Sequence, residues 1–213
     1  FNKKEFNYDK FKEFFELPGK VGDPKRTKSL FKKIKALKET STLIKEQKRN
    51  ETSNIRCVGL TIETRPDYGL LKHGNEMLKL GATRIELGVQ SVYDKALKEI
   101  DRGHTAEQTK QSIQELSDLG FKLNFHYMIG LPKTTKKQDL DGLNELFKNP
   151  EYRPDMLKIY PCMVMKGTKL HEDYNKNKFK PLTTMEAAKI IADFKRNVPT
   201  YCRIMRVQRD IPT

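Results

Sequence analysis

The feature that most constrains the fold is a regular alternation of short apolar runs and longer helical segments after Arg56. The apolar runs lie at 57–62, 84–89, 122–129, 156–160 and 201–207, and helical patterns lie at 70–80, 92–100, 105–119, 138–147 and 183–196. Such strand–helix units are typical of a parallel sheet with helical crossovers. We therefore predict an α/β fold with four or five parallel strands. This is too few for a closed eight-stranded barrel, and both an open sheet and a partial barrel agree with the pattern.

The first 55 residues show no such alternation. Phe11, Phe14, Phe15 and Leu17 precede the breaker Pro18-Gly19. Further on, apolar residues recur at helical spacing with lysines between them, at Leu30, Ile34, Leu37 and Ile44. This predicts one amphipathic helix over 25–49 with a basic outer face. We divide the chain into a basic helical segment, 1–55, and a core, 56–213.

Positive charge is concentrated in the first quarter of the chain. The formal net charge is +14, and residues 1–56 hold 16 Lys and Arg against 8 Asp and Glu, a net of +8. A surface this positive favours polyanions such as RNA. A lysine-rich composition shared by all proteins of the source would give the same charge, so the alternative stays open.

The three cysteines, Cys57, Cys162 and Cys202, are too far apart to form a chelating loop, and an odd number argues against a disulfide framework. We expect each to be a small buried residue, in a reducing, cytoplasmic setting, with no metal bound by this chain. No run of 18 apolar residues is present, so we expect no membrane span. The abrupt ends, at Phe1 and Thr213, suggest a piece of a longer protein.

Polar side chains interrupt the predicted strands near their carboxyl ends, where parallel α/β proteins bind ligands. They are Glu63, Glu86, Gln90, His126, Lys158 and Tyr160. A buried charge without a partner is costly, so these residues either contact a ligand or pair with one another. The pairs Glu63–Arg65 and Glu86–Lys158 are the alternative to a binding site.

Several motifs resemble one known family. They are Gly59-Leu60-Thr61-Ile62-Glu63-Thr64-Arg65-Pro66-Asp67-Tyr68, Glu86-Leu87-Gly88-Val89-Gln90-Ser91, Asp101-Arg102-Gly103-His104-Thr105, Leu157-Lys158-Ile159-Tyr160-Pro161 and Arg206-Val207-Gln208-Arg209-Asp210-Ile211-Pro212. Together they resemble the radical S-adenosylmethionine core of the Elongator catalytic subunit. The resemblance covers residues 57–213 almost without a break, and residues 1–56 show only loose similarity.

The resemblance implies a partial (βα)6 barrel, of which this chain holds strands three to six, and it places residues 1–55 in the second crossover. It also implies three cofactors: S-adenosylmethionine, a four-iron four-sulfur cluster and acetyl-CoA. The family's cluster-binding cysteine loop, its Gly-Gly-Thr segment and its acetyl-CoA-binding domain are absent from this sequence.

Site residues follow from the same resemblance. Glu63, Gln90 and Arg102 are expected to contact S-adenosylmethionine. His126 either contacts its ribose or lines the substrate channel, and Met128 to Gly130 form a wall for the adenine. Lys158 and Tyr160 are candidates for contact with acetyl-CoA or the uridine. Six basic residues are candidates for RNA phosphates: Lys32, Lys33, Lys35, Arg203, Arg206 and Arg209.

The implied function is carboxymethylation of carbon 5 of the tRNA wobble uridine. The implied partners are tRNA and either further Elongator-type subunits or a second copy of the chain. Two alternatives remain: a radical S-adenosylmethionine enzyme with another substrate, and an RNA-binding or scaffolding module without catalysis.

Overall fold

The computed structural model describes residues 6–20 and 22–208, and the chain packs as two units, Phe1–Arg56 and Cys57–Thr213. Each unit is described by itself. Within the described residues, no helix has the length and apolar content that crossing a bilayer requires.

The first unit contains three helices: α1 (Tyr8–Phe15), α2 (Pro24–Ala36) and α3 (Leu43–Thr52). None of them has a buried residue. Polar contacts hold α1 to α2, because the Arg26 guanidinium donates to the Phe15 carbonyl at 2.8 Å and Lys33 pairs with Glu16 at 2.8 Å. The unit is therefore joined largely by polar contacts at its surface.

The prediction of one helix over 25–49 is wrong. The structure ends α2 at Ala36 and begins α3 at Leu43. Thr42 is the N-cap of α3, and its hydroxyl accepts a hydrogen bond from the Lys45 amide at 3.3 Å. Threonine competes for backbone hydrogen bonds and so favours a helix start over a helix interior, which the spacing of apolar residues does not reveal.

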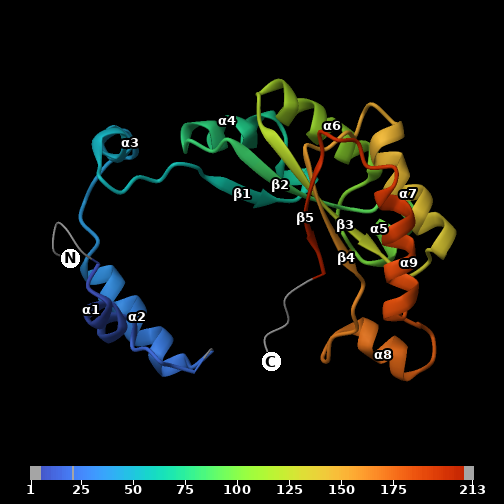
Figure 1. Cartoon of the computed structure of the whole chain (residues 1–213), viewed down its shortest axis with the longest axis horizontal. Helices are drawn as coiled ribbons and strands as arrows, with labels where there is room; N and C mark the ends of the chain where they lie inside the picture. The colour runs from blue at the N-terminus through green and yellow to red at the C-terminus, as the bar shows by residue number, and fades with distance from the viewer. Residues whose placement is uncertain (1–5, 21, 209–213) are drawn as a thin grey trace. The chain divides into compact units, whose positions relative to one another are not determined.

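The described part of the second unit is built on a sheet of five parallel strands in sequential order (Figure 1). They are β1 (Thr61–Thr64), β2 (Arg84–Gln90), β3 (Lys122–Ile129), β4 (Met156–Pro161) and β5 (Arg203–Val207). The α/β class and the five-strand reading of the pattern are confirmed. The numbering implied by the resemblance, strands three to six, allowed for one strand fewer.

Strand β1 begins later than predicted. Residues 57–60 lie outside it, and Val58 is 91% exposed. The reason is the partner strand: Arg84, the first residue of β2, lies opposite Thr61, so the preceding residues have no strand to pair with. The apolar run is real, but pairing decides where the strand begins.

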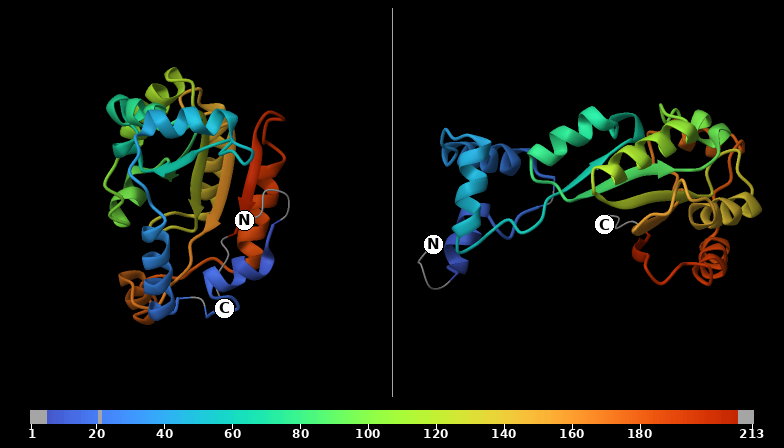
Figure 2. Two further views of the ribbon diagram at one scale, coloured as in Figure 1. Left: turned by 90° about the vertical axis from the view of Figure 1, so that its left-hand side faces the viewer. Right: turned by 90° about the horizontal axis from the view of Figure 1, so that it is seen from above.

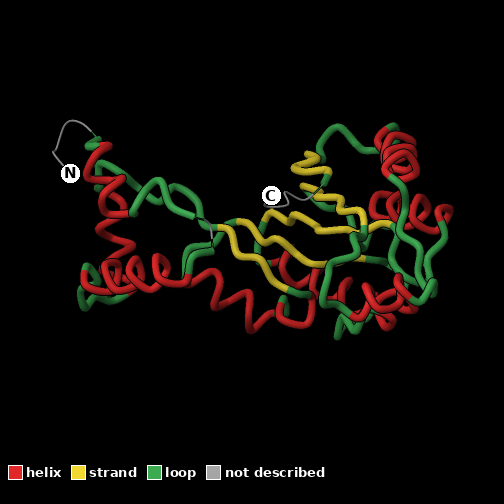
Figure 3. Tube along the Cα trace, turned by 90° about the horizontal axis from the view of Figure 1, so that it is seen from below, coloured by secondary structure: helices red, strands yellow, loops and turns green. Residues whose placement is uncertain are grey.

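Helices connect the strands, and the longer ones cover one face of the sheet, as further views show (Figure 2; Figure 3). They are α4 (Leu71–Lys79), α5 (Asp94–Glu99), α6 (Ala106–Asp118), α7 (Lys136–Lys148), α8 (Lys169–Asn175) and α9 (Thr184–Lys195), with a 3-10 turn η1 (Pro66–Tyr68). Threonine caps begin the longest of these helices, and a Gln or Glu three residues later completes the capping box of α6, α7 and α9. Helix α8, which is short and polar, was not predicted.

Alternate residues of each strand point to opposite faces of the sheet. The apolar set, including Leu87, Phe125 and Leu157, is fully buried against α6, α7 and α9 and forms the main core. The intervening set is polar and belongs to the other face. The core thus sits under one side of the sheet, and the candidate site lies on the other.

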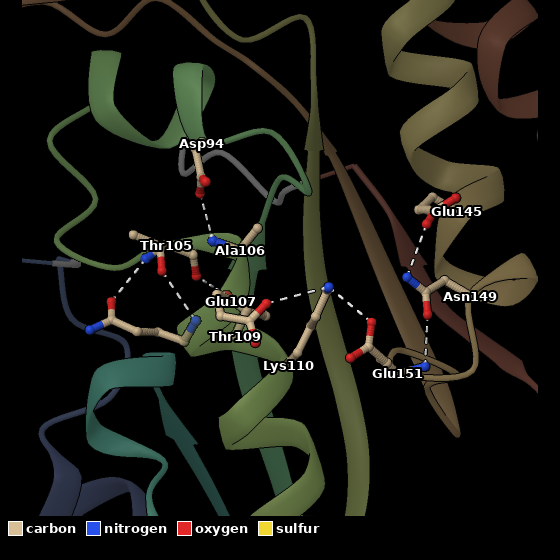
Figure 4. Close-up of polar contacts among 10 residues, drawn as sticks. Asp94, Thr105, Ala106, Glu107, Thr109, Lys110, Glu145, Asn149 and Glu151 are labelled. Atoms are coloured by element: carbon tan, nitrogen blue, oxygen red, sulfur yellow. Dashed lines mark hydrogen bonds and ion pairs between the residues drawn. The ribbon is translucent and has the colours of Figure 1, made fainter.

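Surface ion pairs connect neighbouring crossovers. Lys110 of α6 pairs with Glu107 and, at 2.9 Å, with Glu151 beyond α7, while the Asp94 carboxylate accepts the Ala106 amide at 2.7 Å (Figure 4). Water screens exposed pairs of this kind and they add little to stability, so the core sets the stability of the unit.

Candidate active site

A belt of charged side chains crosses the face of the sheet opposite the core. Glu63 lies opposite Glu86 on β1 and β2, and His126, Lys158 and Arg206 lie opposite one another on β3, β4 and β5. The acidic residues occupy one half of the sheet and the basic residues the other. The polar residues predicted near the strand ends therefore share one face.

Glu86 is the centre of this belt. It is only 7% exposed, and its carboxylate accepts hydrogen bonds from His126 Nε2 at 2.7 Å, from Asn124 Nδ2 at 3.3 Å and from the Lys158 ammonium. Burial alone would raise the Glu86 pKa, but the hydrogen bonds from Lys158 and His126 outweigh it and hold the pKa below its usual value. The Glu86–Lys158 ion pair, one of the two pairs weighed from sequence, is therefore confirmed.

His126 links the two carboxylates. Its Nδ1 lies 3.5 Å from Glu63 Oε1 and its Nε2 contacts Glu86, while its ring meets the Tyr160 ring edge to face with centroids 5.6 Å apart. Glu63, Glu86 and His126 are close enough to hold a metal ion. Both Glu86 oxygens already have partners, since Lys158 and His126 contact Oε2 and the Asn124 amide donates to Oε1. The arrangement is therefore best described as an ion-pair network, with Glu63, whose side chain is 67% exposed, at its open end.

Half of the predicted site residues line one cavity of about 410 Å³ beside this belt. Its lining contains seven of them, Glu63, Gln90, His126, Met128, Lys158, Tyr160 and Arg206, together with Pro161, Met163 and Met165. This central cavity has an acidic and a basic side and a wall of three methionines. Thioether side chains provide a polarizable, adaptable surface suited to a flat aromatic ligand.

Arg102 lies close to Gly88 and Gln90, near the end of β2. Its Nη2 donates to the Gly88 carbonyl at 3.3 Å, and a Cβ at Gly88 would lie 2.2 Å from the same nitrogen, so the arginine needs a glycine there. Among the described residues, Arg102 Nε and Gln90 Oε1 are buried without a hydrogen-bond partner. Burial lowers the Arg102 pKa. These are polar atoms that a ligand could satisfy.

Two expected contacts take a different form. Arg65 pairs with Asp67 and not with Glu63, and the pKa of Asp67 is lowered by this partner. Gly130 lies in another cavity, away from Met128, and its amide donates to Asp139 at 2.8 Å. A positive φ of 71° and the close approach of Leu182 explain the glycine, so its position has a structural reason.

The predicted RNA-binding residues fall in three places. Lys32 and Lys35 border a hollow in the first unit beside Phe31, whereas Lys33 is held by Glu16 and by the Phe14 carbonyl. Arg203 is exposed at the start of β5 and Arg206 lines the central cavity. Arg209 lies outside the described residues.

Two features of the site were not predicted from the sequence. Glu86 was expected to contact a ligand or to pair with Lys158, but not to hold three partners, although a glutamate between Ile85 and Leu87 in a buried strand signals a larger network. Met163 and Met165 were not singled out; they follow the Pro161 that ends β4. The expectation that each cysteine is buried is wrong for Cys57, which precedes β1 and is exposed, whereas Cys162 and Cys202 are buried.

Comparison with known sequences gives two family matches, one of which begins in the first unit. The Radical SAM superfamily pattern matches residues 22–144, and the Radical_SAM C-terminal domain pattern matches residues 154–213. The tRNA uridine(34) acetyltransferase of Methanocaldococcus infernus is 48% identical over 175 residues, which cover 82% of this chain and 33% of that protein. Elongator complex protein 3 of Homo sapiens is 41% identical over 165 residues, covering 78% of this chain and 30% of that protein.

Solved structures show the same fold. The Methanocaldococcus infernus Elp3 with an N-terminal deletion superposes with a TM-score of 0.79 at 48% identity, over 82% of this chain and 41% of that one. Coproporphyrinogen III oxidase from Escherichia coli, a radical SAM enzyme, superposes with a TM-score of 0.52 at 17% identity, over 72% and 36%, which shows likeness of fold alone. The chain therefore belongs to the radical SAM superfamily and, within it, to the family of Elongator complex protein 3 and archaeal tRNA uridine(34) acetyltransferases, spanning about a third of the length of these relatives.

Proposed function

We propose that the central cavity binds S-adenosylmethionine on its acidic side and a tRNA uridine on its basic side, as part of an enzyme that modifies carbon 5 of the wobble uridine with acetyl-CoA. The observation that carries the proposal is the convergence of seven predicted site residues on one cavity with its charges separated across the sheet. The relatives' names, tRNA uridine(34) acetyltransferase and Elongator complex protein 3, support the substrate class and suggest Elongator subunits as partners.

The acidic side fits the cofactor by its chemistry. S-adenosylmethionine offers a positive sulfonium, an ammonium and carboxylate, and two ribose hydroxyls. Glu63 presents an exposed carboxylate to the cavity, and Gln90 and Arg102 have buried atoms that lack partners among the described residues. Carboxylate, amide and guanidinium groups are suited to bind these features. Met128 supplies apolar surface for the adenine.

The basic side fits an electron-rich base. Lys158 and Arg206 face the cavity from β4 and β5, and Tyr160 adds a hydroxyl at the end of β4. Cationic and hydroxyl donors can hold the carbonyl oxygens of a uracil, and Met163 and Met165 can cover its face. Glu86 holds Lys158 in place through their ion pair.

The iron–sulfur cluster does not fit this chain alone, because its cysteines gather at no common point among the described residues. The superfamily implies a cluster and S-adenosylmethionine, which together supply one-electron chemistry for hydrogen abstraction. We propose that segments beyond this chain hold the cluster. The chain's own contribution is to bind, orient and cover the reactants.

The proposal is tested by equilibrium binding of S-adenosylmethionine to a full-length protein that carries this chain. Glu63→Gln should weaken binding about tenfold or more, since a hydrogen bond to a charged group contributes about 1.5–3 kcal/mol. The exposed Glu76→Gln on α4 is the control and should have no effect. Tyr160→Phe should slow uridine modification and leave cofactor affinity unchanged.

Equal cofactor affinity in the wild type and Glu63→Gln would disprove the cofactor site. Binding of tRNA without any binding of S-adenosylmethionine would favour the RNA-binding or scaffolding alternative. Turnover of another substrate, with no affinity for tRNA, would favour a different radical S-adenosylmethionine enzyme.

A further inference from the structure

A second hollow region in the 57–213 unit is separate from the central cavity. It consists of two adjoining cavities of about 330 and 430 Å³, which share the residues Pro132, Lys133, Lys178 and Phe179. The loop after β3 forms one wall, and the segment between α8 and α9 forms the other. None of its residues was singled out for RNA from the sequence.

The smaller cavity is strongly basic. Lys133, Lys136, Lys178 and Lys180 line it with a single acid, Asp139, a formal net of +3. Asp139 is 3% exposed and turned to the protein, where it accepts the Gly130 amide, and burial raises its pKa. Lys136 pairs with Glu186, whereas the other three lysines form no ion pair among the described residues. Three lysines that form no ion pair among the described residues, gathered around one cavity, favour an anion of phosphate size.

The larger cavity has a different character. It is lined by three lysines, two of which it shares with the smaller cavity, and by three acidic residues, Glu99, Asp101 and Asp173. Ile100, Leu170 and Phe179 give it apolar surface. Phe179 is half-buried and packs on the small core around Leu131. A neutral cavity with an anchored aromatic ring and nearby hydrogen-bonding groups suits a nucleoside, because bases stack on aromatic side chains.

One loop connects this region to the central cavity. In the segment after β4, Met163 and Met165 line the central cavity, and Thr168 lines the larger of the two outer cavities. Both regions also lie at the edge of the sheet where the strands end, since the residues that follow β3 and β4 form their walls. A chain with one base in the central cavity can therefore continue over this loop.

We infer that these outer cavities bind a second nucleotide of the same RNA, with its phosphate among Lys133, Lys178 and Lys180 and its base against Phe179. This inference rests on the proposed function, because it assumes an RNA whose uridine enters the central cavity. The proposed subsite holds the neighbouring RNA backbone and so fixes the direction in which the RNA leaves the central cavity.

The test measures binding of an anticodon stem-loop RNA to the full-length protein carrying this chain, over a range of salt concentrations. The triple variant K133A/K178A/K180A removes three charges at the outer cavities. The matched control, K72A/K95A/K189A, removes three exposed lysines from α4, α5 and α9 that also lack ion pairs among the described residues. Phe179→Leu keeps the side chain apolar but removes the aromatic ring.

The outer-cavity triple should bind RNA at least tenfold more weakly than the control triple at low salt. The slope of log K against log salt should fall by about 0.7 for each phosphate that the lysines no longer neutralise. Phe179→Leu should weaken binding several-fold with an unchanged slope, because stacking releases no counterions. S-adenosylmethionine affinity should not change in any of these variants.

Equal RNA affinity and slope in the two triple variants would overturn the inference and leave the proposed function intact. A selective loss of acetyl-CoA affinity in the outer-cavity triple, with RNA affinity unchanged, would also overturn it and would assign the lysines to the phosphates of coenzyme A. Failure of the wild type to bind RNA would instead overturn the proposed function on which the inference rests.

Discussion

The two units of the chain use the same residue types in different ways. In the 57–213 unit, Phe125 and Leu157 are fully buried, and the charged residues are held in a fixed order on the opposite face of the sheet. In the first unit, Phe31 is 60% exposed and Ile44 78% exposed, and the helices have no buried residue. A buried core holds the side chains above it in the fixed positions that a binding site requires. A basic surface can attract a polyanion through its charge without such fixed positions. The comparison predicts that the units differ in their response to mutation.

The largest difference is expected for loss of an aromatic ring. Phe125→Ala in β3 should cost about 3–5 kcal/mol, because it leaves a cavity in a close-packed core. Phe31→Ala in α2 should change the free energy of unfolding by less than about 0.5 kcal/mol. Chemical denaturation followed by circular dichroism measures both. Similar losses in the two variants would show that the first unit has a core of its own.

A somewhat smaller effect is expected at Glu86. Glu86→Ala should cost about 3 kcal/mol, because it leaves the Lys158 ammonium without its partner in a mostly buried place. The control Glu76→Ala, which removes an exposed ion pair with Lys79, should cost less than about 1 kcal/mol.

The pH dependence of Glu86 follows from the direction of its pKa shift. The folded pKa is lower than the unfolded one, so its contribution to stability is present above about pH 4.5 and is lost as pH falls through the folded pKa. Glu86→Gln should flatten the acid side of the stability curve. An unchanged acid limb would mean that this carboxylate is not ionised in the network.

Helix α7 offers a test at the scale of one methyl group. A Cβ at Gly142 would lie 2.1 Å from the hydroxyl of Tyr127, which is 1% exposed. Gly142→Ala should therefore cost about 1–3 kcal/mol by overpacking. Gly59→Ala, at an exposed position with nothing within 4 Å, should be neutral or slightly stabilising. A neutral Gly142→Ala would show that α7 can move away from the sheet.

The smallest effect on stability is expected for two exposed lysines that are candidates for RNA contact. Lys32→Ala with Lys35→Ala should leave unfolding unchanged and weaken RNA binding, with a slope against salt lower by about 0.7 to 0.9 for each phosphate contact. Lys45→Ala with Lys48→Ala, on the exposed surface of α3, is the charge-matched control. Equal losses of RNA affinity in the two double variants would show that the basic surface of the first unit attracts RNA by charge alone.

How far the sequence predicts the fold depends on whether a signal is local. The strand at 122–129 and the helix that follows Thr183 were predicted nearly to the residue, since apolar runs and threonine caps are local. The first strand was placed too early because its start depends on β2, and the helix over 25–49 was drawn through a threonine cap. The first error concerns pairing with a distant strand, which a short stretch of sequence does not reveal. The second overlooked a local signal, the threonine cap of α3.

The candidate site shows the same division. Strand periodicity brought Glu63, His126 and Lys158 to one face, as expected. Periodicity could not reveal that Glu86 holds three partners at once, or that Met163 and Met165 turn back over the cavity, because those contacts join residues far apart in the chain. Gly130 was grouped with Met128 because no nearby residue in the sequence indicates that Leu182 packs against it.

The alternation that places Leu87 in the core and Glu86 on the opposite face of the sheet also limits how this part of the protein can change. An insertion of one residue within β2 would reverse the sides of every residue beyond it, which would bury a carboxylate in the core and expose a leucine to the ligand. The alternation along β2 thus decides at once which side chains pack in the core and which lie on the face of the candidate site. We expect β2 to tolerate substitutions at single positions but not changes in its length, so variation in length should be confined to the loops after the strands.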